Sequence, residues 1–222
     1  MKKWLFEEAK NPTIVTKVID LIGLNLIFII SCLPILTIGA SLTSLYTVTL
    51  KMVDSEKDYF LVKDYIKAFK SNFLQSTTVM GIVLLKAAVL IGIIFLINRA
   101  AGDTEPSLMI TAPFLLVVTV MILVVLYLFP LVAYFENTIG QTFKNALIMS
   151  FHQMAKSIVL FAIVLIIIVI VPLFFTQLWF LWLLMAFSLT AYLHSMILIR
   201  IFKSYTNQIE EPKEKRRKSK VK

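Results

Sequence analysis

The sequence has one cysteine and two histidines among its 222 residues. A single cysteine excludes an intrachain disulfide, and a zinc site needs about four suitable ligands close together. Cys32, His152 and His194 lie in different segments, so we expect no metal site. The chain also lacks a Ser-His-Asp arrangement, a His-Glu-x-x-His motif and a Walker glycine loop. We therefore expect no catalytic residues, no cofactor and no enzymatic activity.

Charged residues are also scarce. They make up 16% of the chain, whereas hydrophobic residues make up 59%. A soluble domain has about 25% charged residues, and a helix needs roughly 20 apolar residues to cross a bilayer. Several runs approach that length, so the sequence predicts an all-α integral membrane protein. The net charge of +9 comes mainly from residues that flank these runs, which indicates membrane orientation rather than nucleic-acid binding.

The hydrophobic runs predict a six-span helical bundle. They cover residues 15–33, 35–53, 77–97, 108–132, 157–174 and 178–202. Lysines precede the first run and follow the second, and positive residues prefer the cytoplasmic side. If residues 35–53 cross the membrane, both lysine groups and both termini lie inside. We expect one transmembrane domain over residues 1–203, followed by a disordered basic tail over residues 204–222 that meets anionic lipid head groups.

The interruption between the first two runs is the most distinctive stretch. Residues 33–46 read LPILTIGASLTSLY, with a proline and a glycine followed by small hydroxyl residues. We interpret it as a turn that allows close packing of the two helices it joins, because small residues let helices approach and hydroxyl groups bond across them. An unwound hairpin that lines a substrate path is the alternative. The candidate packing residues are Pro34, Gly39, Ser41, Thr43 and Ser44.

Two further stretches are predicted as cytoplasmic amphipathic helices, at residues 57–73 and 136–156. Their apolar side chains recur at spacings of three and four, which is typical of one helix face. These faces would rest on lipid or contact another membrane subunit. The candidate partner-contact face of the first helix consists of Tyr59, Val62, Ile66, Phe69 and Phe73.

Lys86 is the sharpest single candidate. It lies about ten residues into its run, so its Cα is roughly 15 Å deep at 1.5 Å per residue. A lysine there costs about 2.5–3.5 kcal/mol, so we expect it to face the bundle interior or a polar cavity. Asp20 is the predicted partner, and Glu136, nearer the inner surface, is the less favoured one. The pair would fix the helix register or, alternatively, take part in transport or gating. We interpret His194 as a hydrogen-bonded packing residue, with a proton relay as the alternative.

Residues 33–46, together with LNL at 24–26 and FKSNF at 69–73, resemble the YesL family of bacterial membrane proteins. Chain length and span layout are similar as well. The resemblance implies a multi-pass protein of the bacterial plasma membrane, with relatives that are often encoded beside carbohydrate ABC importers and glycan-degrading enzymes. It implies no established catalytic residue.

On this resemblance we expect a non-enzymatic accessory subunit of a carbohydrate ABC importer. It would contact the permease or ATPase subunits and support the assembly or regulation of sugar uptake. The Glu-Ala-Ala…Gly motif of ordinary ABC permeases is missing from residues 134–157, which argues against a permease subunit. A self-sufficient transporter or channel, a membrane scaffold or signalling adaptor, and a homo-oligomer are alternatives.

Overall fold

The computed structural model describes residues 14–54, 58–101, 108–174, 177 and 179–220. The regular elements in this part of the chain are helical, and six of the helical stretches are long and apolar enough to cross a membrane. This agrees with the expected all-α, multi-pass architecture. The elements are α2 (Ile14–Ser31), the 3-10 turn η1 (Ile35–Thr37), α3 (Ile38–Val53), α4 (Leu61–Ala101), α5 (Leu108–Tyr134), α6 (Ile139–His152), α7 (Met154–Val164), the π-helix η2 (Leu165–Ile170), α8 (Val171–Phe174) and α9 (Trp179–Lys220).

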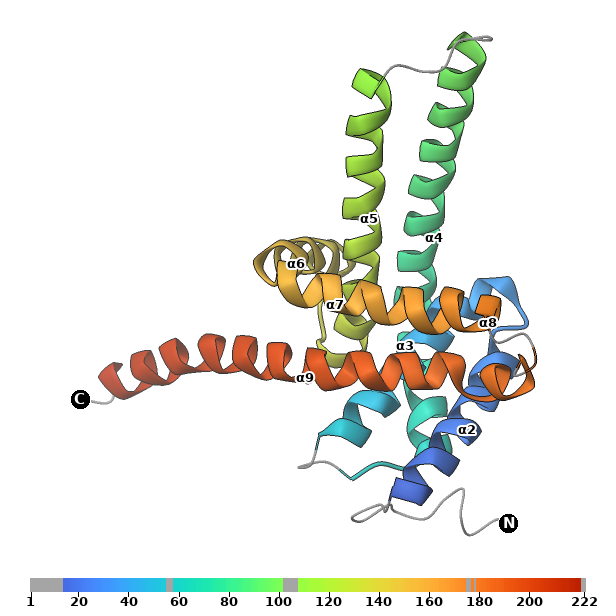
Figure 1. Cartoon of the computed structure of the whole chain (residues 1–222). Helices are drawn as coiled ribbons and strands as arrows, with labels where there is room; N and C mark the ends of the chain where they lie inside the picture. Colours follow the sequence, from blue (N-terminus) through green and yellow to red (C-terminus); the bar gives the residue numbers. More distant parts are fainter. Residues whose placement is uncertain (1–13, 55–57, 102–107, 175–176, 178, 221–222) are drawn as a thin grey trace.

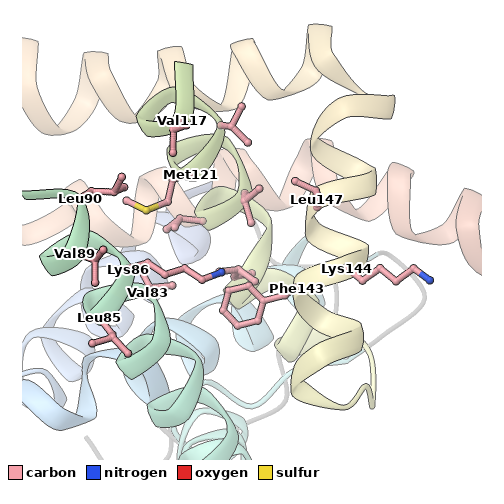
Figure 2. Close-up of a pocket in the computed structure, with 14 residues that line it drawn as sticks. Val83, Leu85, Lys86, Val89, Leu90, Val117, Met121, Phe143, Lys144 and Leu147 are labelled. Carbon is pink, nitrogen blue, oxygen red and sulfur yellow. The ribbon is translucent and has the colours of Figure 1, made fainter. Parts of the chain in front are cut away.

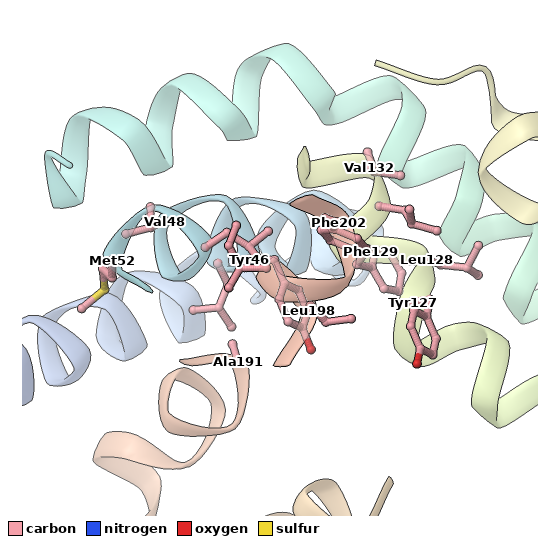
Figure 3. Packing of buried hydrophobic residues seen from close by; sticks show 14 of the residues in the cluster. Tyr46, Val48, Met52, Tyr127, Leu128, Phe129, Val132, Ala191, Leu198 and Phe202 are labelled. Atoms are coloured by element: carbon pink, nitrogen blue, oxygen red, sulfur yellow. The ribbon is translucent and has the colours of Figure 1, made fainter. Parts of the chain in front are cut away.

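Helix α3 lies in the interior of the fold. It contacts α4, α9 and α5 more extensively than its sequence neighbour α2. Val48 of α3, Leu128 of α5 and both Leu198 and Phe202 of α9 are fully buried in one hydrophobic core (Figure 3). The core therefore forms where α3, α5 and α9 meet.

Helices α4 and α5 stand side by side and extend beyond the rest of the molecule (Figure 1). The most apolar window of α4 has no buried residue. Leu85, Leu96 and Leu116 are each about two thirds exposed. A surface this apolar fits contact with lipid rather than water, because large exposed apolar patches are rare on soluble monomers. Within the described residues, the projecting part of the hairpin is therefore built for a membrane or a membrane partner.

The first predicted amphipathic helix is not a separate element. Helix α4 begins at Leu61 and continues for 41 residues to Ala101, so the amphipathic stretch and the third hydrophobic run form one helix. Residues 74–76 contain neither glycine nor proline, so nothing local ends the helix there. At its start, the Asp64 carboxylate accepts a hydrogen bond from the Phe60 backbone N–H at 2.9 Å.

The second predicted amphipathic stretch contains α6 and the start of α7, with a break at Gln153. Thr138 and Gln141 form a capping box that starts α6, since each side chain bonds the other residue's backbone N–H. Residues 135–138 between α5 and α6 are not helical, and this cap fixes where α6 begins.

Helix α9 extends to Lys220, through the tail that was expected to be disordered. Glutamate, lysine and arginine dominate residues 210–220 and are good helix formers, which explains the continuation. The side chains beyond residue 206 lie outside the described part of the structure, so lipid contact by the tail stays a prediction.

Candidate functional site

The turn between α2 and α3 positions Gly39 against α4. A Cβ atom at Gly39 would lie 2.5 Å from the Ser76 carbonyl oxygen and 3.0 Å from the Met80 Cβ. Beside this contact, the Thr43 and Ser76 hydroxyl oxygens are 2.8 Å apart and share a hydrogen bond. Close approach and hydroxyl pairing were both predicted for this stretch. The helix approached, however, is α4, whereas the prediction paired the two helices that the turn joins.

The other predicted turn residues play different parts. Pro34 is exposed and precedes η1. The Ser44 hydroxyl donates to the Ala40 carbonyl within α3 at 2.7 Å, and Ser41 is fully buried. The Ser44 hydroxyl is thus hydrogen-bonded within its own helix and needs no partner on a neighbouring helix.

Asn25 joins α2 to α9 through both ends of its side-chain amide. The Nδ2 group donates to the Leu183 carbonyl at 2.7 Å, and the Oδ1 atom accepts from the Ser188 backbone N–H at 3.0 Å. Asn25 is fully buried. An asparagine inside a hydrophobic run was visible in the sequence, but its partners depend on how α2 and α9 pack. Sequence reasoning therefore missed its role.

A second buried connection joins α3, α7 and α9 at His194. The His194 Nε2 atom lies 3.0 Å from the Leu160 carbonyl oxygen, and Nδ1 lies 3.0 Å from the Tyr46 hydroxyl oxygen. A carbonyl only accepts, so Nε2 carries a proton, and in a neutral ring Nδ1 accepts from Tyr46. Nearby, the Thr49 and Ser195 hydroxyls share a hydrogen bond of 2.8 Å. His194 is thus placed as a fully buried packing residue.

Tyr46→Phe is expected to lower the free energy of unfolding by about 1–3 kcal/mol, because it leaves the buried Nδ1 atom of His194 without its donor. The measurement is the thermal midpoint in detergent solution, expected to fall by about 2–12 °C. Tyr205→Phe is the matched control, since Tyr205 is only half-buried at the edge of the core. Equal midpoints for Tyr46→Phe and the unmodified protein would contradict the assigned contact.

The predicted pair between Lys86 and Asp20 does not form. The Asp20 carboxylate accepts a hydrogen bond from the Tyr59 hydroxyl at 2.8 Å, and both residues are buried. Burial, with the hydrogen bond and charge of Asp20, raises the pKa of Tyr59 above its usual range. Lys86 instead faces α6, where its ammonium nitrogen lies 4.9 Å from the centre of the Phe143 ring. The pairing was wrong because α2 packs mainly on α9 rather than on the part of α4 that holds Lys86.

Lys86 lies in a groove of about 690 Å³ between α4, α5 and α6. Figure 2 shows its side chain reaching from α4 across the groove toward Phe143, whereas Lys144 extends away from it. None of the lining residues is acidic, and apart from the two lysines all are apolar. The apolar lining on α4 and α5 includes Val89, Leu90, Val117, Val120, Met121 and Val124.

The predicted partner-contact face lies largely inside the chain's own fold. Tyr59 is buried on Asp20, and Val62 and Phe69 pack against the hydrophobic core. The Phe69 and Phe73 rings contact each other at 5.7 Å between centroids. Ile66 is the member of this face that is clearly exposed. This arrangement contradicts a free docking face at these five residues.

Two ion pairs fasten the polar end of α3. The Lys51 ammonium lies 2.9 Å from the Asp64 carboxylate of α4, and the Lys203 ammonium of α9 lies 3.0 Å from Asp54. Among the residues that the structure describes, no three histidine, cysteine or acidic side chains gather as a metal site.

Comparison with known protein families finds a match for one segment of the chain. Residues 21–99 match the family described as "Protein of unknown function, DUF624". Neither a curated protein nor a solved structure gives a significant match. The matched segment holds Asn25, the turn at 33–46, α3 and nearly all of α4, including Lys86. Residues 21–99 are therefore similar to the DUF624 domain, which is the domain of the YesL-like family.

Proposed function

We propose that this protein is a non-enzymatic accessory subunit in the bacterial plasma membrane, with both termini in the cytoplasm. It associates with a carbohydrate ABC importer and supports the assembly or regulation of sugar uptake. The YesL-like domain supports this proposal, because the resemblance implies relatives encoded beside such importers.

The observation that carries a partner role is an exposed apolar strip on α6 and α7. We call it the α6–α7 surface. Its members are each between 46% and 63% exposed. The opposite side of the same helices is anchored in the core, since Ala146 and Met149 of α6 and Leu160 of α7 are buried, so the strip is held against the bundle. A rigid apolar surface suits docking on another membrane subunit, because little side-chain or loop ordering is lost on binding. The α6–α7 surface consists of Ile148, Phe151, Met154 and Ile158.

Affinity purification in a mild detergent tests this proposal. The tagged protein is expected to co-purify permease and ATPase subunits of an ABC importer. The double variant Ile148→Ala/Phe151→Ala is expected to reduce that recovery by about tenfold, the equivalent of about 1.4 kcal/mol of binding. Leu115→Ala/Leu116→Ala on the projecting hairpin is the matched control, because both leucines are similarly exposed.

The self-sufficient transporter gains no support from the site geometry. Lys86 faces Phe143, Asp20 bonds Tyr59, and His194 bonds Tyr46, so the three side chains make separate contacts. Purification of a homo-oligomer that carries no importer subunit and moves sugar into liposomes would overturn the accessory role.

A further inference from the structure

The Lys86 groove contains a positive charge with no internal counter-charge. Lys86 is exposed, and within the described residues no carboxylate lies within ion-pair distance of its ammonium group. Its contact with the Phe143 ring attracts the ammonium group but contributes no negative charge. A lysine among apolar side chains in a membrane is costly unless it has a counter-charge, and the ring alone does not supply one. An anionic ligand in the groove would neutralise the Lys86 ammonium group.

The rest of the groove restricts what kind of anion fits. Beyond Lys86 the lining continues along α4 and α5 as apolar side chains that include Val89, Val117 and Met121 (Figure 2). A ligand site of about 690 Å³ is within the usual range for small molecules. One cation followed by an apolar channel matches an amphiphile with one negative group and a hydrocarbon chain. A small inorganic anion would leave the apolar part of the groove unfilled. A helix of a partner protein would fit only if it carried an acidic side chain at the level of Lys86.

We propose that the groove between α4, α5 and α6 binds an anionic phospholipid. The Lys86 side chain extends toward Phe143 of α6, the stretch predicted to lie at the cytoplasmic membrane surface, and there a lipid phosphate pairs with the ammonium group. One acyl chain lies along the apolar lining of α4 and α5. Basic pockets between transmembrane helices commonly receive anionic head groups in this way. The site is separate from the α6–α7 surface and does not depend on an importer.

Photolabelling in nanodiscs tests the proposal. The full-length protein is reconstituted in phosphatidylcholine with a trace of phosphatidylglycerol that carries a diazirine in its acyl chain. A diazirine phosphatidylcholine is used in parallel. Labelled residues are mapped by mass spectrometry. The phosphatidylglycerol probe is expected to label the segments around Val89 and Met121 about fivefold more than the neutral probe, since one lysine near a membrane surface contributes about 1 kcal/mol.

Charge variants separate the groove from other basic residues. Lys86→Met is expected to bring the labelling ratio of the two probes to about one, and Lys86→Arg is expected to keep the preference. Lys67→Met is the matched control, because Lys67 is an exposed lysine of α4 outside the groove. Because the basic tail is present in every variant, its lipid contacts do not affect the comparison. Equal labelling by both probes in the unmodified protein, or an unchanged ratio in Lys86→Met, would overturn the proposal.

Further experiments test the shape of the groove and the source of the bound phosphate group without changing the charge of Lys86. Val117→Trp is expected to reduce labelling around Met121 severalfold by filling the groove, whereas Leu116→Trp, outside the lining, is expected to have no effect. Millimolar inorganic phosphate is expected to leave labelling unchanged, and competition by it would show a site for free phosphate. A dimer that forms in the unmodified protein and is lost in Lys86→Met would show that a second copy fills the groove. Either result would refute lipid binding there.

Discussion

Gly39→Val is expected to lower the free energy of unfolding by about 3 kcal/mol, at the upper end of the usual range for overpacking. The first added carbon would lie 2.5 Å from the Ser76 carbonyl oxygen of α4, far inside van der Waals contact. That oxygen belongs to a helix backbone, which cannot move aside as a flexible side chain does. Relief requires α3 and α4 to separate, and this breaks the hydrogen bond between Thr43 and Ser76. The measurement is the thermal midpoint in detergent, expected to fall by about 6–12 °C.

Two glycines of α4 provide the control for this substitution. Nothing lies within 4 Å of a Cβ built at Gly81 or Gly92. Both positions are helical, so Gly81→Ala and Gly92→Ala are expected to be neutral or to stabilise by up to about 1 kcal/mol through helix propensity. If Gly39→Ala and Gly81→Ala change the midpoint equally, the close approach of α3 to α4 is wrong.

Asn25→Leu is the second substitution with a large expected effect. It keeps the branched shape and the number of heavy atoms of the side chain but removes the partners of the Leu183 carbonyl and the Ser188 N–H. Each buried polar group without a partner costs about 1–3 kcal/mol, so we expect a loss of about 3 kcal/mol in the free energy of unfolding. The protein is expected to elute as aggregate in size-exclusion chromatography at temperatures where the unmodified chain is monodisperse.

Asn25→Asp distinguishes the two hydrogen bonds. An ionised aspartate still accepts from the Ser188 N–H but cannot donate to Leu183. Its charge is buried as well, so it is expected to be no better tolerated than Asn25→Leu. The control is Leu26→Ala, at an exposed neighbour on the same helix. A stable Asn25→Leu protein would show that the backbone of α9 satisfies both groups without α2.

The hydrophobic runs predicted the helices well because the length and apolar composition of a span are properties of consecutive residues. The same reasoning divided residues 57–97 into two helices. The change from a polar to an apolar surface near residue 77 is a change of environment along α4, and no glycine or proline breaks the helix there. The spacing of apolar residues shows which face of a helix is buried. It does not show where one continuous helix passes from water into the membrane.

The predicted contacts were less successful, and Lys86 shows the reason. The sequence predicted that Lys86 faces the interior beside an acid, whereas its side chain is exposed in an apolar groove. Asp20 was the predicted partner because it is an acid at a suitable depth. In the structure, Asp20 accepts a hydrogen bond from Tyr59, and Lys86 lies beside Phe143. Depth in a span is a one-dimensional quantity, but pairing also depends on rotation about each helix axis and on which helices are neighbours.

The sequence by itself determined that the chain is helical and has six stretches long and apolar enough to cross a membrane, and it indicated close packing by the glycine and hydroxyl residues at 33–46. It could do so because hydropathy and residue size act locally. Only the tertiary structure decided that Gly39 meets α4, that Asn25 and His194 tie other helices to α9, and that Lys86 opens into an apolar groove. These contacts join residues that are far apart in the chain, so they depend on the packing of whole helices.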